Sequence, residues 1–470
     1  MRPERDKIFF ILSHLIFLVS LIVVSQIPRL YPLIHERYLP PMDRYLRFYM
    51  IGVFSVVFLA YYLCIHFCKK ANISFFKPDG LSAYFWVSTA FVFLILCSSS
   101  ALLSHDLYEY SMRARMLSVY KLNPYLHTPL EIKNDIFFPL IFWKSTPECY
   151  GPLWVSIGTF HTLFFKSSIA LTSFTHKFIL LVFLGLTVSV FYKLSKEIMP
   201  KKAGLVTVAF LLNPLIVIMT LIDGHNEIAM AFFILCAFYF LVKSKYVFSF
   251  MLFAMAIAVK FIYLMLIPIF ILYILFNSET KSGRERVYNM ITGALSFAFI
   301  TVIAWFPFGR ESFKAIIHYY SELSKNFWFD SIPYAAYFIS DKLGLTISKN
   351  LIASLFSSLF GMIYFCIIGY FLKKVKADRQ VIFTSSVLIL LALLLTNSTP
   401  FQAWYLIWVI PFIFLSKIRL KFQLVFLLSY FLIMTFWKRM FVLAAPMIII
   451  YFSMLLFYKY MRDKAGYRNA

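Results

Sequence analysis

Charged residues are scarce in this chain. Only 14% of its 470 residues are Asp, Glu, Lys or Arg, while 61% are hydrophobic and 20% aromatic. Soluble domains carry roughly a quarter charged residues, so this composition excludes an ordinary soluble protein. Apolar runs of about 17 to 25 residues recur throughout and are long enough to cross a bilayer. We therefore predict an all-α polytopic membrane protein that forms one domain over residues 1–470.

Acidic residues are rarer than basic ones. The chain has 21 Asp and Glu against 45 Lys and Arg, a net charge of +24. In a soluble protein this excess would suggest nucleic acid, but short basic loops between membrane helices instead set topology by the positive-inside rule. We expect no nucleic-acid partner and place both termini in the cytoplasm. Residues 8–26 lack a following small-residue cleavage site, which indicates a retained first helix.

The sequence also lacks a cysteine framework and a metal motif. Of the six cysteines, only Cys149 lies in a polar loop, which argues against disulfides. The spacing Cys64-x-His66-x-Cys68 fits no familiar metal site. There is no paired Asp-x-Asp either. We expect no obligatory metal and no other cofactor.

The apolar runs predict about 12–14 transmembrane helices. Their approximate spans are 8–26, 46–67, 82–103, 173–193, 203–221, 226–242, 246–259, 261–276, 287–305, 349–372, 380–397, 401–416, 420–436 and 439–459.

Two long external loops are expected between these spans, at 104–172 and 306–348. Residues 150–166 are apolar enough to suggest another span, but a span there would move every later basic loop outside. We therefore predict that they lie in the interface or re-enter, with Trp154 and His161 at the water boundary. In the second loop, apolar residues at helical spacing predict an interfacial helix near 313–323.

Apart from their ends, the membrane segments are almost bare of charge. This argues against an ion-coupled transporter or a channel, which place charged residues at mid-membrane depth. The predicted topology gathers the ionisable residues at the outer face instead. They are Asp106, Glu109, Arg113, Arg115, Asp223, His225, Glu227 and Lys260.

One carboxylate beside several cations suits an inverting sugar transfer. A base takes the proton of the acceptor hydroxyl, and cations stabilise a leaving phosphate. Asp106 is the candidate base, and Arg115, His225 and Lys260 are candidate phosphate contacts. Structural alternatives exist for each: Asp106 could cap a helix, Arg115 could be a snorkelling interface anchor, and Lys260 could be an ordinary lysine at a helix end. Arg115 could also order the loop instead of binding phosphate. His225 and Asn226 could cap the helix at 226–242.

Five motifs follow one another along the chain. They are Asp106-x-Tyr108-x-Tyr110 with Arg115 and Asn123-Pro124-Tyr125; Tyr150-Gly151-Pro152-Leu153; Asp223-Gly224-His225-Asn226-Glu227; Val259-Lys260 with Pro268; and Phe401-Gln402-Ala403-Trp404-Tyr405-Leu406-Ile407-Trp408. In this order they resemble GT-C superfamily glycosyltransferases, especially bacterial polyprenyl-phosphate-mannose-dependent mannosyltransferases. The resemblance covers about residues 82–415. Ala114, Gly151 and Glu227 depart from the family pattern.

The resemblance implies a GT-C-like fold whose first external loop carries the catalytic Asp106. It implies a polyprenyl-phosphate-linked sugar donor and an active site facing away from the cytoplasm. A bacterial plasma membrane and a cell-envelope glycan, lipid or polymer acceptor fit this reading. Further candidates for substrate binding are Tyr108, Asn226, Gln402, Trp404 and Tyr405, the last three of which could instead form an aromatic belt. Possible secondary acids are Glu109, Asp223 and Glu227.

Two other functions remain open from the sequence. A flippase or exporter of lipid-linked saccharides would also need many helices, but it requires polar residues along a path through the membrane. An inactive scaffold with a GT-C-like fold would not depend on Asp106.

Overall fold

The computed structural model describes residues 2–30, 44–73, 75–276, 282–323, 331–397 and 401–436. Within these ranges every regular element is a helix, as predicted. The elements are α1 (Arg2–Leu30), α2 (Arg44–Lys70), α3 (Gly80–Leu96), α4 (Asp106–Ser118), η2 (Pro129–Ile132), η3 (Phe138–Leu140), α5 (Pro152–Phe164), α6 (Ile169–Ile198), η4 (Pro200–Lys202), α7 (Ala203–Leu211), α8 (Pro214–Val217), η5 (Ile218–Ile222), α9 (Glu227–Val242), α10 (Tyr246–Val259), η6 (Phe261–Leu266), α11 (Ile267–Phe276), α12 (Gly283–Trp305), α13 (Gly309–Leu323), α14 (Ile332–Lys342), α15 (Lys349–Lys374), α16 (Val381–Thr396), η7 (Ala403–Trp408), α17 (Ile410–Leu415) and α18 (Lys421–Phe436).

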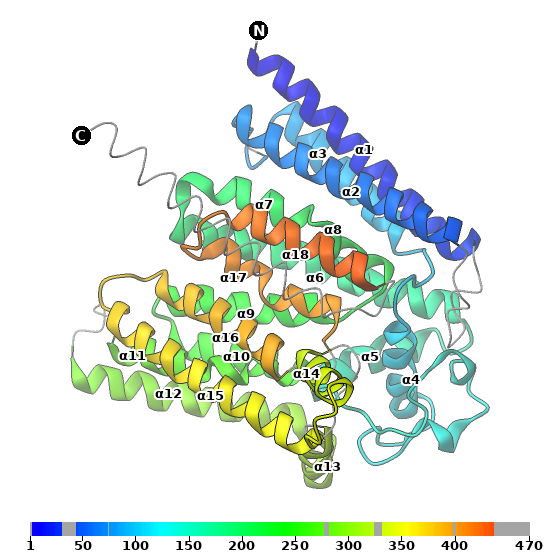
Figure 1. Cartoon of the computed structure of the whole chain (residues 1–470), viewed down its shortest axis with the longest axis vertical. Helices are drawn as coiled ribbons and strands as arrows, with labels where there is room; N and C mark the ends of the chain where they lie inside the picture. Colours follow the sequence, from blue (N-terminus) through cyan, green and yellow to red (C-terminus); the bar gives the residue numbers. More distant parts are fainter. Residues whose placement is uncertain are drawn as a thin grey trace.

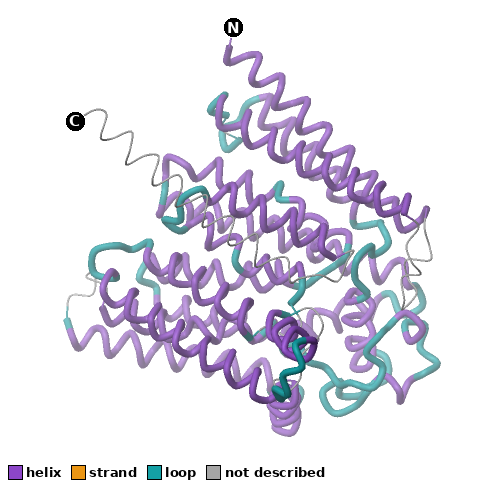
Figure 2. Tube along the Cα trace, viewed as in Figure 1, coloured by secondary structure: helices purple, strands orange, loops and turns teal. Residues whose placement is uncertain are grey.

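The long helices form a bundle with a short-helix layer at one end (Figure 1). Helices α1, α2 and α3 lie together on one flank, and α12 and α15 lie on the opposite flank. Helices α4, α5, α13 and α14 gather at one end, which we call the α4 end. Most of the loop around α4 and α5 lies there as well (Figure 2). The chain thus builds its irregular structure at one end of the bundle.

Burial separates central helices from peripheral ones. α9 and α16 are apolar on all sides and largely buried, as expected for helices inside a bundle. The most apolar windows of α12 and α15 are only 6% and 11% buried. Because these exposed faces are apolar, they are suited to contact with lipid.

Helix length confirms an apolar multi-pass protein. Among the described residues, five helices are long and apolar enough to cross a membrane, and a bent pair would make a sixth. Seven more apolar helices have 10–17 residues. Most of the predicted spans are therefore present, several as shorter helices. The predicted span 439–459 lies outside the described residues.

Two predicted helices are wrong in their continuity. The span 203–221 is broken after α7, with a bend of 48°. The break has a local cause: the Asn213 side chain accepts hydrogen bonds from the amides of Leu215 and Ile216, and Pro214 starts the new helix. The span 82–103 ends at Leu96, and the chain then leaves helical geometry before α4 begins.

The helix at 150–166 is too short to span. α5 has 13 residues, about 20 Å at 1.5 Å per residue, against a hydrocarbon core of about 30 Å. It packs against α4, α6 and α10 at the α4 end. The Trp154 and His161 side chains are buried in these contacts, 3% and 2% exposed. Their placement at the water boundary stays a prediction.

The two long loops meet at the α4 end. Asn123 Nδ2 donates to the Phe308 carbonyl at 3.0 Å and to Ser312 Oγ at 2.8 Å. Tyr320, on α13, donates to the Cys149 carbonyl at 2.9 Å. The first loop is therefore covered by α13, the helix predicted near 313–323.

Candidate active site

Asp106 is the first residue of α4 and faces two other elements. Its amide donates to Ser104 Oγ at 3.1 Å. Its carboxylate Oδ2 lies 3.5 Å from the Tyr110 hydroxyl, one turn further along α4. The same oxygen lies 3.5 Å from His225 Nδ1, and the Asp106 side chain is 20% exposed. Asp106 is thus a partly accessible carboxylate in a largely buried polar cluster.

His225 reaches Asp106 from the turn before α9. Gly224 makes this turn with φ = +76°, a left-handed conformation that favours glycine. His176 Nε2 lies 2.9 Å from the Gly224 carbonyl and fixes the turn from α6. The His225 ring stacks on Trp404 with centroids 3.8 Å apart. These contacts fix the plane of the imidazole toward the carboxylate.

Lys260 directly follows α10, and its side chain lies beside Glu227. Its Nζ donates to Glu227 Oε1 at 2.6 Å. Three aromatic rings surround the ammonium group, with centroids 5.1 Å (Tyr150), 4.9 Å (Tyr405) and 5.1 Å (Trp408) away. A cation between aromatic faces is stabilised electrostatically. We call Asp106, His225, Asn226, Glu227 and Lys260 the polar cluster.

The first loop is joined to α10 just beside Lys260. The Gly151 amide donates to the Val259 carbonyl at 2.9 Å. That carbonyl is available because the chain turns extended at Lys260 and leaves the helix. A Cβ atom on Gly151 would overlap the Ala258 carbonyl. The departure from the family pattern at Gly151 therefore has a structural reason, because the backbone of the first loop lies directly against the backbone at the end of α10.

Several buried polar atoms of the cluster have no hydrogen-bond partner within the described part of the chain. They are both ring nitrogens of His225, both side-chain polar atoms of Asn226 and Oε2 of Glu227. All three residues are 0% exposed. Buried polar groups are normally satisfied, so such a concentration indicates a site that takes up a polar ligand.

The electrostatics of the cluster tune Asp106. Burial raises the pKa of its carboxyl to about 7, and the neighbouring Glu109 and Glu227 carboxylates act in the same direction while Lys260 opposes them. A carboxylate with a pKa near neutrality is a stronger base than an ordinary one and is still half ionised at pH 7. Helices α4 and α9 both begin here, and helix N-termini favour anions.

Arg115 does not join the polar cluster. Its guanidinium donates to both carboxylate oxygens of Asp135, at 2.7 to 3.0 Å, and to the Lys166 carbonyl at 2.6 Å. With these partners and only 4% exposure, Arg115 orders the first loop, the alternative noted from the sequence. The structure gives no support to its predicted contact with phosphate.

Two of the three predicted secondary acids accept hydrogen bonds from backbone amides. Glu109 accepts from the amides of Phe142 and Trp143, the latter at 2.7 Å. Asp223 accepts from the amides of Leu102 and Leu103 at 2.7 and 2.8 Å. This contact ties the entry of α4 to the turn before α9. Of the three acids, only Glu227 lies in the polar cluster.

Among the aromatic residues predicted to bind substrate, Tyr108 does not contact the polar cluster. It packs with Phe137 in a small apolar cluster of the first loop and is 8% exposed. Trp404 and Tyr405 do contact the polar cluster, through His225 and Lys260. Gln402 precedes η7, and its carbonyl accepts from the Tyr405 amide at 3.1 Å. A substrate contact for Gln402 stays a prediction.

Sequence reasoning missed four residues that surround the cluster. Tyr110, Tyr150 and Trp408 belonged to the motifs but were not selected, and His176 had no local signal. Helical spacing of four residues from Asp106 would have favoured Tyr110 over Tyr108. The approach of Tyr150 to Lys260 depends on the Gly151 contact, which spacing alone does not reveal.

Comparison with known families decides the class of protein. A family model described as alpha-(1->6)-mannopyranosyltransferase, N-terminal domain, matches residues 10–276, more than half of the chain. The chain belongs to this family. Its class is therefore that of a glycosyltransferase, and the match includes Asp106, the turn at 223–227 and Lys260. The comparisons with curated proteins and with solved structures gave no match.

Replacing Gly151 by Ala tests the joint between the first loop and α10. The added methyl group meets backbone, which cannot rotate away, so we expect a loss of about 1–3 kcal/mol in the free energy of unfolding. Thermal unfolding of the purified full chain measures it. Gly185→Ala on α6 is the matched control, because a Cβ there has open space. Equal melting temperatures for the two variants would contradict the assigned contact.

Proposed function

We propose that the protein transfers mannose from a polyprenyl-phosphate donor to a hydroxyl of a cell-envelope glycan, lipid or polymer, with inversion and with Asp106 as the base. The observation that carries this proposal is the position of Asp106 beside buried polar side chains, two of which, His225 and Asn226, have no hydrogen-bond partner within the described residues. Asp106 is the partly accessible acid of the polar cluster, and His225, Asn226 and Lys260 supply donors and positive charge beside it.

The transfer requires one proton acceptor and one anion site. The acceptor oxygen attacks the anomeric carbon as its proton passes to Asp106. The bond from that carbon to the phosphate oxygen breaks, and the polyprenyl phosphate leaves with the electron pair. Because a phosphate leaves without protonation, Lys260, His225 and the N-terminus of α9 are sufficient to stabilise it. No metal or other cofactor is part of the proposal.

The stereochemistry of an inverting transfer is consistent with the activity of the family. Inversion turns a β-linked donor into an α-linked product. The α-(1→6) linkage in the family description therefore fits a β-linked polyprenyl-phosphate mannose. The aromatic rings of Trp404 and Tyr405 suit a sugar ring above the phosphate, since apolar sugar faces pack on aromatic groups.

We place the reaction at the non-cytoplasmic face of a bacterial plasma membrane. Positive-inside topology puts the α4 end outside and the termini inside. The polyprenyl chain of the donor would lie among the membrane helices below Lys260. Their apolar surfaces match an isoprenoid in polarity.

The distribution of buried charge favours a transferase over a flippase. Apart from Asp6 and His14, the buried Asp, Glu, His, Lys and Arg residues of the described chain belong to the α4 end. They are Glu109, Arg113, Arg115, Asp135, Glu148, His161, His176, Lys177, Asp223, His225, Glu227 and Lys260. A flippase would need polar groups along the whole path of the saccharide.

Replacing Asp106 by Asn tests the proposed base. We expect transfer from radiolabelled polyprenyl-phosphate mannose to fall about 10²- to 10⁴-fold, because the amide cannot accept the proton. The assay uses membranes with equal amounts of each variant. Glu131→Gln is the control, since this exposed carboxylate pairs with His127 in the same loop. Equal, measurable transfer by Asp106→Asn and wild type would exclude Asp106 as the base. An inactive scaffold would show no transfer with either protein.

The pH dependence of transfer tests the environment of Asp106. The base must be ionised, and burial raises its pKa to about 7, so kcat/KM should rise with pH and level off above about 7. Glu227→Gln removes a neighbouring negative charge, and its acid limb should move to lower pH. A wild-type kcat/KM that is constant from pH 5 to 8 would contradict this assignment. An acid limb that moves to higher pH in Glu227→Gln would contradict it as well.

A further inference from the structure

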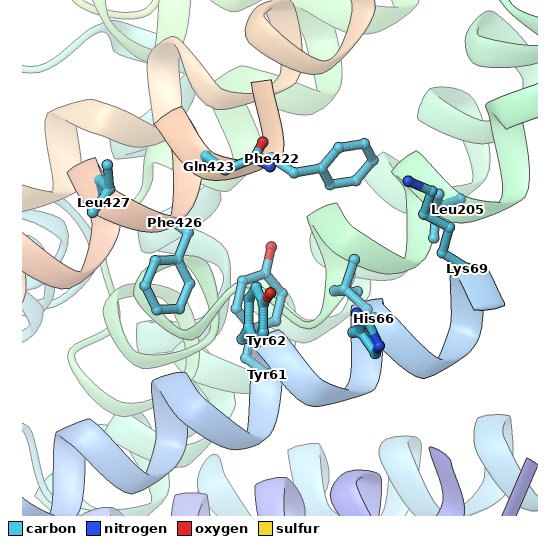
Figure 3. Close-up of a pocket in the computed structure, with 10 residues that line it drawn as sticks. Tyr61, Tyr62, His66, Lys69, Leu205, Phe422, Gln423, Phe426 and Leu427 are labelled. Atoms are coloured by element: carbon cyan, nitrogen blue, oxygen red, sulfur yellow. The ribbon is translucent and has the colours of Figure 1, made fainter. Parts of the chain in front are cut away.

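A second site lies at the other end of the bundle. A cavity of about 310 Å³ is lined by faces of α2 and α18, with Leu205 of α7 at its edge (Figure 3). Its lining residues come from α2, α7 and α18, and no residue of the polar cluster belongs to these helices. The volume is within the range of ligand sites, about 300–1,000 Å³.

The walls of this groove are fixed. Tyr61, on α2, donates to the Ala209 carbonyl of α7 at 2.9 Å. Further along, Ser55 and Tyr430 hydroxyls lie 3.1 Å apart and join α2 to α18. Phe58 and Phe426 pack edge to face, with centroids 5.8 Å apart. The groove is therefore formed by paired helices that hold each other in place.

The groove is apolar inside and basic at its rim. Its interior is formed by Ile65, Leu205, Phe422, Phe426 and Leu427, together with the ring of Tyr61. Tyr62, His66, Lys69 and Gln423 stand at the exposed rim. None of the ten lining residues is acidic. An apolar groove with cationic and hydrogen-bonding groups at the membrane boundary matches a lipid with an anionic head group.

Two neighbouring lysines in the last turn of α2 differ in their partners. Lys70 pairs with Asp6 of α1 at 3.0 Å, so its charge is compensated away from the groove. Lys69 lines the groove, and within the described residues it has no acidic partner. Its charge is therefore available to a ligand in the groove.

We propose that this groove binds an anionic phospholipid, with its phosphate between Lys69 and His66 and one acyl chain between α2 and α18. The phosphate accepts hydrogen bonds from the rim, and the chain covers Tyr62, Phe426 and Leu427. This site is separate from the sugar-transfer site, and the proposal does not depend on the proposed function.

Native mass spectrometry of the full-length protein in detergent tests the head-group contact. The probe is an equimolar mixture of phosphatidylglycerol and phosphatidylcholine with identical acyl chains. The wild type should retain phosphatidylglycerol preferentially. Lys69→Ala should reduce that preference about five-fold, the equivalent of about 1 kcal/mol for one basic residue near an anionic surface. Lys70→Ala is the matched control and should keep the preference, because Lys70 is paired with Asp6.

A second variant tests the chain contact. Leu427→Trp fills the groove without changing charge, so retention of both lipids should fall. Equal retention of the two lipids by the wild type, or equal effects of Lys69→Ala and Lys70→Ala, would overturn the proposal. Retention of neither lipid by the wild type would also overturn it and would leave a segment of the chain itself, such as residues 437–470, as the occupant to examine.

Discussion

The charge of Lys260 is the constraint on which the site depends. An ammonium group among apolar helices is costly unless it is paired. Glu227 pairs with it at 2.6 Å, and the rings of Tyr150, Tyr405 and Trp408 enclose it. These partners come from three separate segments, so the pairing fixes the start of α9, the first loop and η7 relative to the end of α10.

The charged residues of the α4 end divide into two groups by their partners. Arg115, Glu109 and Asp223 each bind Asp135 or backbone groups through at least one side-chain polar atom. They order the first loop. The polar cluster differs because no side-chain polar atom of His225 or Asn226 has a hydrogen-bond partner within the described residues, at full burial. In the account proposed here, the first group positions Asp106 and the second group meets the donor.

The class of fold was predictable from the sequence, and so was the proximity of Asp106, His225, Glu227 and Lys260, but the roles of single residues were less so. Long apolar runs determine membrane helices through composition alone, and motif order brought Asp106, the 223–227 turn and Lys260 into one set. Spacing could not show that the Arg115 guanidinium donates hydrogen bonds to Asp135, since these residues are 20 positions apart and the folding of the loop brings them together. It also could not show that the Leu102 and Leu103 amides bind Asp223.

The most direct measurement of the central claim is a structure of the Asp106→Asn variant with polyprenyl-phosphate mannose bound, determined in a lipid environment. The account predicts the donor phosphate within hydrogen-bond distance of Lys260 and of His225 or Asn226. It also predicts the anomeric carbon on the side that faces residue 106. A donor phosphate bound elsewhere, beside Arg115 or in the groove between α2 and α18, would contradict it.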